Sequence, residues 1–521
     1  MEGDYYTEKA YYLSFLDHDI TGRSGEKESL RTTPLFSLAV KHAVDKTFQK
    51  QRAEIPEASK AVSGEAIDSA SESEDGGSIV PVNLKARYPG RTLPMPILPQ
   101  YGLLGFHVGK HDRISHHEPI MMNVHAPNSA FICGSQGSGK SYTLNCFLEN
   151  CLLADACTGK LLQPLAGLLF HYDIDSSGMV AETASLCSRG IRVNVLVSSS
   201  NLEAAQRNYR AVTNKSEYLT VEKFLLSPSD LSIERMHKLM AFSDRSDAVP
   251  LYMEVIQRIL RQMAILGHGR GFNYGEFLQL LDQAGLSPEQ QRPMRLRLDL
   301  LHSFMRWPPS KTDLKRKLAR KLLDLQPGTL TIVDLSDPFV DTATVCTLFD
   351  ICLSVAKEKR PECGMVVALD EAHKYIDQSP AATNFTNRVL TTIREQRHIG
   401  TRVVISTQEP TISEQLLDLC SISIVHHFKS PKWFRSIRDH LGGASGLINS
   451  EKDQARLFEE ILMLPVGESR VFVPSAFVCL STDGQPKKLG SDVLRMRTRS
   501  RLGTDAGVSL LAGEKYGGSS R

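Results

Sequence analysis

The chain has 521 residues, of which 41% are hydrophobic and 23% are charged. This composition is ordinary for a globular protein with a buried core, and it excludes wholesale disorder, collagen-like repeats and coiled-coil fibres. The formal net charge is only +2, from 61 Lys and Arg against 59 Asp and Glu, so any nucleic-acid surface has to be a local patch.

The cysteines and the first residues indicate the compartment. None of the ten cysteines forms a Cys-x-x-Cys pair, so we expect free thiols rather than disulfides or a zinc site. The sequence begins MEGDYYTEKAYYL, which lacks the basic and then apolar pattern of a signal peptide. No apolar run approaches the roughly 20 residues that span a bilayer. We therefore expect an intracellular protein, cytoplasmic or nuclear, that is neither secreted nor membrane-spanning.

The two ends of the chain differ in composition from its centre. Residues 1–52 form an N-terminal segment whose fold the sequence leaves open. Residues 53–100 are predicted to be a disordered or extended linker, because Ser, Glu, Ala and Gly dominate its first half and prolines follow. Residues 506–521 are predicted to be a flexible tail.

Short apolar runs alternate with helical stretches in the ranges 101–220 and 327–505. Strands that alternate with crossover helices predict an α/β fold with a mostly parallel sheet covered on both faces. The predicted strands are 130–133, 167–172, 191–197, 329–335, 365–369 and 402–406, and the predicted helices begin at residue 140 and near residue 180 and cover 342–357 and 384–397.

The range 221–326 has a different pattern. Leu251, Val255, Ile259 and Met263 recur at helical spacing, and no strand pattern interrupts them. We predict an all-helical subdomain there, inserted between the two parts of the α/β core.

A glycine-rich stretch after the first predicted strand fits the phosphate-binding pattern G-x-x-x-x-G-K-[ST]. Glycines let the backbone wrap tightly so that its N–H groups point at an anion, and the following helix adds its positive end. Lys140 is predicted to reach the β- and γ-phosphates of ATP, and the Ser141 hydroxyl to bind Mg²⁺. The competing interpretation is an accidental glycine-rich turn. The predicted nucleotide-binding residues are Gly134, Ser135, Gln136, Gly137, Ser138, Gly139, Lys140, Ser141 and Tyr142.

A second apolar run, 364–369, ends in the carboxylates of Asp370 and Glu371. A buried strand that ends in two acids is the expected second half of a nucleotide site. Asp370 is predicted to hold Mg²⁺ together with Ser141, and Glu371 to orient and deprotonate the attacking water. A solvated strand end is the alternative interpretation.

Other polar residues stand at the ends of predicted elements. Gln408 follows a strand and is predicted to contact the γ-phosphate or the lytic water, with a solvent-facing glutamine as the alternative. Arg394 and Arg397 end a helix, where either one can stabilise transition-state charge in a neighbouring subunit or simply face water. For Asp173 and Asp175, which end another strand, a turn-forming role is favoured over contact with the nucleotide.

The order of these motifs resembles that of the HerA/FtsK superfamily of ring-forming motor ATPases, especially its HerA-like branch. The matching stretches are 119–141, 170–175, 331–336, 369–376, 394–402 and 406–410. The resemblance implies a RecA-like core, a hexameric ring and ATP-driven movement of DNA through a central channel. It assigns the roles above to Lys140, Ser141, Asp370, Glu371 and Gln408, and implies that Arg394 or Arg397 is the arginine that acts on a neighbour.

Related families fit less well. DEAH-box helicases share the letters Asp-Glu-Ala-His at 370–373, but they need a second RecA-like domain, for which too little chain follows residue 425. ABC ATPases need a Leu-Ser-Gly-Gly-Gln signature, which this chain lacks. HerA proteins usually carry an N-terminal β-barrel, and the first 100 residues give no sequence sign of one.

Two groups of basic residues have no assigned role. The first is a stretch within 311–321, preceded by Arg292, Arg295 and Arg297, and it either grips phosphates or forms a solvated helix face. In the second, four arginines alternate with uncharged residues, which places them on one face of a strand. We expect that face to contact the nucleotide, a neighbouring subunit or DNA, and a disordered basic tail is the alternative. These four are Arg495, Arg497, Arg499 and Arg501.

The sequence as a whole predicts an ATPase that requires Mg²⁺ and works as an oligomer on double-stranded DNA, as a translocase or a helicase-like motor. The alternative is an ATPase that remodels or tethers protein partners without nucleic acid. A scaffold that binds ATP without hydrolysing it is disfavoured, because Lys140, Asp370 and Glu371 are all present.

Overall fold

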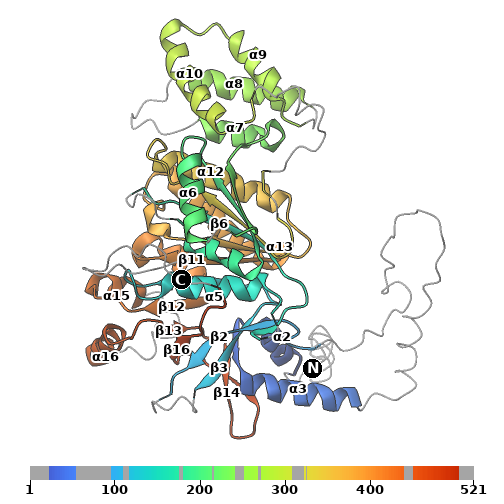
Figure 1. The fold of residues 1–521 in the computed structure, drawn as a ribbon, viewed down its shortest axis with the longest axis vertical. Helices are drawn as coiled ribbons and strands as arrows, with labels where there is room; N and C mark the ends of the chain where they lie inside the picture. Colours follow the sequence, from blue (N-terminus) through green and yellow to red (C-terminus); the bar gives the residue numbers. More distant parts are fainter. Residues whose placement is uncertain are drawn as a thin grey trace, which may run out of the picture.

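The computed structural model describes residues 23–53, 96–109, 117–155, 157–174, 180–213, 216–240, 251–267, 271–307, 322–323, 325–438 and 450–503. The linker residues 54–95, the tail 506–521, Asp175 and the basic stretch 311–321 lie outside these ranges. The described strands form one sheet, and its smaller, mostly antiparallel part lies at the bottom of Figure 1. A group of helices lies above the sheet in the same view.

Eight parallel strands form the centre of the sheet, and every neighbouring pair among them is parallel. Most are buried along their whole length, as apolar strands covered on both faces should be. This confirms the predicted α/β fold with a RecA-like P-loop core, and no predicted strand end is off by more than one residue. In spatial order the strands are β12 (Ile422–His426), β4 (Ser129–Cys133), β11 (Thr401–Thr407), β10 (Met365–Leu369), β6 (Ala166–His171), β9 (Thr329–Asp334), β7 (Arg192–Val197) and β8 (Leu219–Lys223).

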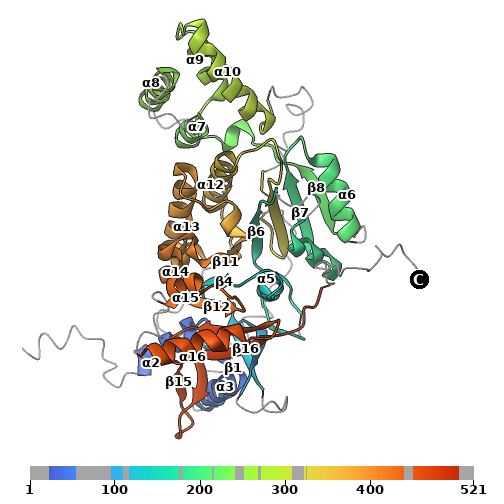
Figure 2. The same cartoon turned by 90° about the vertical axis from the view of Figure 1, so that its left-hand side faces the viewer.

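Helices cover both faces of these strands, as Figure 2 shows. On one face lie α5 (Lys140–Leu152), the 3-10 helix η4 (Glu182–Arg189) and α6 (Leu202–Val212). On the other lie α12 (Thr342–Glu358), α13 (Pro380–Ile399), α14 (Glu414–Leu419), α15 (Pro431–Arg438) and α16 (Glu451–Leu462). The helix predicted near residue 180 is therefore a tighter one, with hydrogen bonds such as that from Ala184 N to the Ala181 carbonyl, three residues back.

Beyond β12 the sheet continues as a mostly antiparallel wing, in which β1 and β14 pair in parallel and of which the sequence predicted just the strand of alternating arginines. Its strands are β13 (Glu468–Phe472), β16 (Leu494–Thr498), β2 (Tyr101–His107), β3 (Glu118–Asn123), β1 (Leu35–Ser37), β14 (Phe477–Leu480) and β15 (Pro486–Lys488), with β5 (Gly159–Lys160) beside β2. The N-terminal segment supplies β1, which lies between β3 and β14, and the helices α2 (Arg23–Thr32) and α3 (Leu38–Ala53). Phe36, Val40 and Val44 pack against Phe477, so the two ends of the chain share a small core.

The helices α7 (Ile233–Met240), α8 (Leu251–Leu266), α9 (Tyr274–Asp282) and α10 (Pro288–Ser303) stand at one end of the sheet (Figure 1). A bridge between Leu226 and Met305 closes the base of this group. Asp350 of α12, which is 2% exposed, binds Lys238 of α7 and Arg388 of α13 and so ties the group to the core. The end of β8, from Val221 to Lys223, belongs to the sheet although it falls within the range predicted to be helical.

None of the helices in the described part of the chain has both the length and the apolar character needed to cross a membrane.

Candidate active site

The predicted phosphate-binding loop connects β4 to α5. Gly134, Gly137 and Gly139 all have positive φ angles, of 156°, 75° and 106°. At Gly134 a Cβ atom would lie 2.7 Å from both His426 Cβ and Ser138 Oγ, so the close approach requires glycine. Gly139 is the left-handed residue directly before α5, whose first N–H groups are free of a side-chain cap. The loop thus has the backbone that an anion-binding nest requires.

Lys140, the first residue of α5, is 4% exposed. Its Nζ donates a hydrogen bond to the Ser135 carbonyl, 3.1 Å away. Burial lowers the pKa of Lys140, and the charges of Glu371 and Asp370 oppose this shift. The ammonium group of Lys140 is desolvated, and its hydrogen bond goes to a neutral carbonyl. A hydrogen bond to an anionic oxygen is stronger, and the oxygens of a phosphate can supply it.

The two carboxylates leave β10 beside the loop. Asp370 is 3% exposed, and its Oδ1 accepts a hydrogen bond of 3.1 Å from Glu371 N. Glu371 is the single non-glycine residue with positive φ in the described part of the chain, with φ 47°. Backbone in this region costs about 1–3 kcal/mol and persists where the surroundings impose it. Burial and the charge of Asp370 raise the pKa of Glu371, while Lys140 lowers it, so the carboxylate is a stronger base than one in water.

Gln408 follows β11 and lies against Glu371. Its Nε2 donates a hydrogen bond of 3.2 Å to Glu371 Oε1, and its backbone N–H points at His373 Nδ1, 3.4 Å away. Burial, with Lys374 and Lys140, lowers the pKa of His373 to about 4, so this ring is neutral near neutral pH. The 3.4 Å separation of His373 Nδ1 from Glu371 Oε2 is therefore no ion pair. In this arrangement Gln408 orients Glu371, a role that the sequence did not suggest.

His171, at the end of β6, is a residue that sequence reasoning missed. Its Nδ1 lies 3.4 Å from Asp370 Oδ2. Burial opposes protonation of this ring, but Asp370, Asp334 and Asp173 outweigh burial and raise its pKa to about 9. The only signal in the sequence is a histidine at the end of an apolar run, just before Asp173.

A second missed residue, His426, packs against the glycines of the loop. It is fully buried at the end of β12, with Nε2 3.0 Å from Thr143 Oγ1 and Nδ1 3.0 Å from the Glu468 carbonyl. Burial lowers its pKa to about 4, so the ring is neutral near neutral pH. The next residue accepts two hydrogen bonds from the loop, since Ser135 N and Oγ donate to the His427 carbonyl over 2.8 and 2.9 Å.

The other predicted residues do not meet at this site. Arg394 and Arg397 are exposed on the last turns of α13, which leads to the beginning of β11, whereas Gln408 follows its end. Seven residues of strand separate these edges by on the order of 20 Å, so neither arginine reaches the loop of its own chain. Asp173 pairs with Lys374 at 2.5 Å, beside the site.

The C-terminal arginines do not form the single basic face that their spacing predicts. Strand β16 ends at Thr498, and beyond it the chain turns over α5. Arg499 is buried and pairs with Glu149 at 2.7 Å, while Arg495 pairs with Glu468 at 2.8 Å. Arg501 stacks over the Tyr142 ring at 4.4 Å, and its backbone N donates to the Tyr142 hydroxyl.

The residues at this edge fit a magnesium ion bound together with ATP. Asp370 and Ser141 supply a carboxylate and a hydroxyl, the oxygen ligands that Mg²⁺ prefers. Glu371 Oε2 beside them is buried without a hydrogen-bond partner, which is typical of a place where a polar ligand sits. Across the described ranges no three His, Cys, Asp or Glu side chains gather as a metal cage. Magnesium commonly takes its remaining ligands from phosphate and water, so no cage is needed.

Comparison with known proteins gives similar structures only. No protein-family model matches the sequence, and no curated protein matches it. VirB4 of Thermoanaerobacter pseudethanolicus is 12% identical, with 77% of this chain and 96% of that chain covered and a TM-score of 0.46. The genome packaging NTPase B204 from Sulfolobus turreted icosahedral virus 2, in complex with ATP-gammaS, is 11% identical, with 68% and 93% covered and a TM-score of 0.25.

The cytoplasmic domain of the Thermomonospora curvata type VII secretion ATPase EccC is also 11% identical, with a TM-score of 0.31. The match covers 77% of this chain but only 29% of that protein. Identities and scores this low carry no functional argument, so the assignment depends on the chain's own features. A loop of P-loop geometry follows β4, two carboxylates follow β10, and β11 with Gln408 lies between them. In fold and motif order the chain is a RecA-like P-loop protein that resembles the HerA/FtsK superfamily.

Proposed function

We propose that this chain binds ATP with Mg²⁺ and hydrolyses it. The observation that carries the proposal is the meeting of Lys140, Asp370 and Glu371 at one edge of the sheet. Glu371 is half-buried, its Oε2 atom is buried without a partner, and Gln408 donates to its other oxygen. In a purely structural cluster each of these oxygens would have a partner, whereas Glu371 Oε2 is left open to a ligand.

Each residue has a separate task in this proposal. The loop N–H groups and Lys140 bind the phosphates, and Asp370 and Ser141 hold the metal. Bound magnesium neutralises phosphate charge and fixes the geometry of the γ-phosphate. Glu371 accepts the proton of the attacking water at Oε2, while Gln408 keeps the carboxylate oriented.

The work that hydrolysis drives is proposed to be movement of double-stranded DNA by a ring oligomer. The resemblance to HerA/FtsK motors supports this. The exposed positions of Arg394 and Arg397 suit a contact with a neighbouring subunit, since neither can serve its own site. Arg258 and Arg261 on α8 and Arg292 and Arg295 on α10 are exposed on the helical insertion, and we propose that they contact the DNA phosphates.

The test is steady-state ATP hydrolysis by the purified chain with and without double-stranded DNA, beside Glu371→Gln. We expect turnover that DNA stimulates and that the substitution lowers by at least about 100-fold, the contribution of a general base. Binding of ATP should survive in Glu371→Gln, because the carboxylate acts on water rather than on the nucleotide. Hydrolysis by Glu371→Gln at the parental rate would refute the catalytic assignment.

One observation favours the alternative, in which the ATPase remodels protein partners. Ile265 and Leu266 of α8 and Leu296 of α10 are 66%, 60% and 71% exposed. Apolar side chains on an insertion far from the site suit a protein surface better than a phosphate backbone. Turnover that ignores DNA at low and high salt would favour this alternative and remove DNA as the track.

A further inference from the structure

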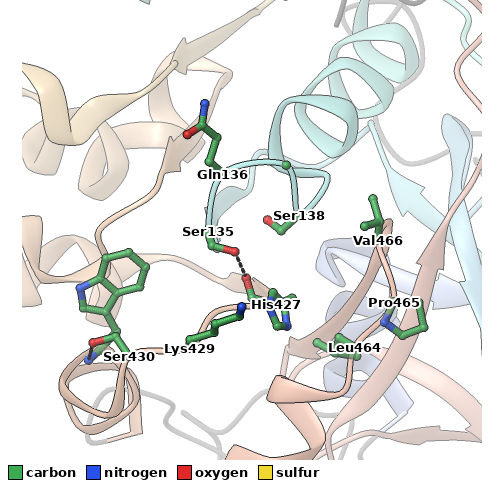
Figure 3. Close-up of a pocket in the computed structure, with 11 residues that line it drawn as sticks. Ser135, Gln136, Ser138, His427, Lys429, Ser430, Leu464, Pro465 and Val466 are labelled. Atoms are coloured by element: carbon green, nitrogen blue, oxygen red, sulfur yellow. Dashed lines mark hydrogen bonds between the residues drawn. The ribbon is translucent and has the colours of Figure 1, made fainter. Parts of the chain in front are cut away.

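A cavity of about 720 Å³ opens on the β12 side of the phosphate-binding loop. Residues 135–138 of the loop form one wall, and His427 and Lys429 form the second (Figure 3). Trp433 also lines the cavity. The stretch 464–466 forms the third, with the apolar side chains of Leu464, Pro465 and Val466. This volume is within the range of about 300–1,000 Å³ that is typical of small-molecule pockets.

The cavity lies on the side of the loop away from the carboxylates. Strand β4, which carries the loop, has β12 on one side and β11 and then β10 on the other. Asp370 and Glu371 follow β10, so the γ-phosphate end of a bound triphosphate faces that side. The nucleoside end then extends toward β12, where the cavity is.

The polar groups in the cavity are of two kinds. Ser135 Oγ donates to the His427 carbonyl and Ser430 Oγ accepts from Trp433 N, so both hydroxyls already have partners. Ser138 Oγ and His427 Nδ1 are buried and have no hydrogen-bond partner among the described residues. Ser138 is only 3% exposed and its Oγ is closed to water in the free chain, so its hydroxyl gains a ligand as partner by turning toward the cavity.

The aromatic and apolar groups favour a flat ring. Trp433 packs beside Phe428, with ring centroids 6.0 Å apart, and it also lines the cavity. Val466 is 74% exposed although it lies beside the loop, so the cavity wall has apolar surface to cover. An indole next to aliphatic side chains offers stacking to any nucleobase, because every base has a π-face.

We propose that this cavity holds the purine base and ribose of the nucleotide and accepts adenine and guanine with similar affinity. The proposal rests on the proposed function, because it extends the same site. Strong discrimination between two bases requires a buried group that can only donate or only accept a hydrogen bond. The wrong base then leaves that group without a hydrogen-bond partner. A serine hydroxyl can donate or accept, and an imidazole nitrogen does either according to its tautomer, so Ser138 and His427 suit the 6-amino group of adenine and the 6-oxo group of guanine equally. Lys429 can donate to N7, which both purines share.

The two tryptophans of the chain, Trp307 and Trp433, allow a direct test. In full-length Trp307→Phe, the fluorescence of Trp433 alone reports on the cavity. ATPγS, GTPγS and inorganic tripolyphosphate are titrated with Mg²⁺, and binding is measured in parallel by equilibrium dialysis. We expect both nucleotides to quench Trp433 with dissociation constants within about tenfold of each other, well below the ~10⁴–10⁵ of a base-reading site. Tripolyphosphate should bind without quenching.

The outcomes separate this proposal from the function beneath it. Bound nucleotide without any change in Trp433 fluorescence would overturn the cavity assignment and leave the ATPase intact. Affinity for ATPγS more than about 100-fold above that for GTPγS would overturn the lack of base selection. If dialysis detects no binding of any of the three, the proposed function fails and this inference fails with it.

A matched pair of variants adds an independent readout. Trp433→Ala should weaken ATPγS and GTPγS alike by about tenfold, the loss of one stacked base, and leave tripolyphosphate binding unchanged. Trp433→Phe keeps an aromatic ring and should retain most of the affinity. An equal loss for tripolyphosphate would mean that Trp433 supports the loop and does not contact a base.

Discussion

Two clusters of buried charge lie near opposite ends of helix α5, and they differ in how their polar atoms are used. At its first turn, Lys140 faces Asp370 and Glu371, and several polar atoms around them have no partner. These unpartnered atoms are Glu371 Oε2, Ser138 Oγ and His171 Nε2. At its last turns, Glu149 binds Arg499, and each of these charged groups is fully hydrogen-bonded.

The second cluster shows what a structural ion pair looks like in this protein. Arg499 donates to the Leu103, Cys146 and Ser500 carbonyls and to Asn150 Oδ1, besides Glu149 Oε2. Glu149 Oε1 accepts from the backbone of Leu502 and Gly503. A buried polar atom without a partner costs about 1–3 kcal/mol, and the first cluster leaves several such atoms in place. The full pairing of Arg499 and Glu149 fits a structural role, and the unpartnered atoms around Lys140 fit the proposed ligand site.

The largest effect should come from Lys140→Ala. Lys140 belongs to the cluster that we propose binds the ligand. Its loss should lower ATP turnover by about 10³-fold, the scale of a lost electrostatic contact in a transition state. The midpoint of urea unfolding should change little, because the hydrogen bond from Lys140 Nζ goes to the neutral Ser135 carbonyl and not to Asp370 or Glu371. Lys357→Ala is the control, since Lys357 forms an ion pair with Glu395 on the helical face. Turnover that drops equally in both variants would break the distinction between the clusters.

Arg499→Met should show the reverse pattern. It leaves Glu149 buried without its counter-charge, and breaking such a pair costs about 3 kcal/mol or more of unfolding free energy. Urea unfolding measures the loss, and turnover per folded molecule should stay near the parental value. The double variant Arg499→Met, Glu149→Leu removes both charges and should regain part of the stability. A loss of turnover in the folded fraction of Arg499→Met would move Arg499 into the ligand site.

His426 gives a smaller, pH-dependent effect. Burial lowers the pKa of His426 to about 4 from the ordinary 6.5. Between these pH values the ring is protonated in the unfolded chain and neutral in the folded chain. The free energy of unfolding is therefore highest above pH 6.5 and falls as the pH drops toward 4. At about pH 5 the loss that His426 causes is about 2 kcal/mol. Urea unfolding at neutral and acid pH, for the parent and for His426→Gln, measures it by difference. Equal acid sensitivity in both proteins would show that other groups control it.

Local signals predicted the parts of the site that lie within one stretch of chain. The glycine pattern before Lys140 and the apolar run before Asp370 and Glu371 need no knowledge of the rest of the molecule. His426 and His171 could not be found in this way, because their meaning depends on Glu468 and Asp370, far away in the sequence.

The four C-terminal arginines show that local spacing can also predict a feature that the structure lacks. Period-two spacing predicted one basic face, but β16 stops at Thr498, and Arg499 meets Glu149, 350 residues earlier in the chain. The rest of the antiparallel wing was invisible for a similar reason. Its strand β1 is three residues long and gains its order from β3 and β14, which come from distant parts of the chain.

The smallest effect separates two roles for Gln408. The sequence predicts contact with the γ-phosphate or the lytic water, whereas the structure has its amide on Glu371, 3.2 Å away. If Gln408 acts only by orienting Glu371, then Gln408→Ala should lower kcat about tenfold, the scale of one hydrogen bond to a charged group, with KM unchanged. Gln408→Glu places a second carboxylate against Glu371, which raises the pKa of Glu371 and shifts the acid limb of the pH–rate profile upward. A raised KM in Gln408→Ala would instead mean that Gln408 binds the nucleotide before the reaction begins. Loss of a contact made equally in the ground and transition states raises KM, whereas loss of a contact made only in the transition state lowers kcat.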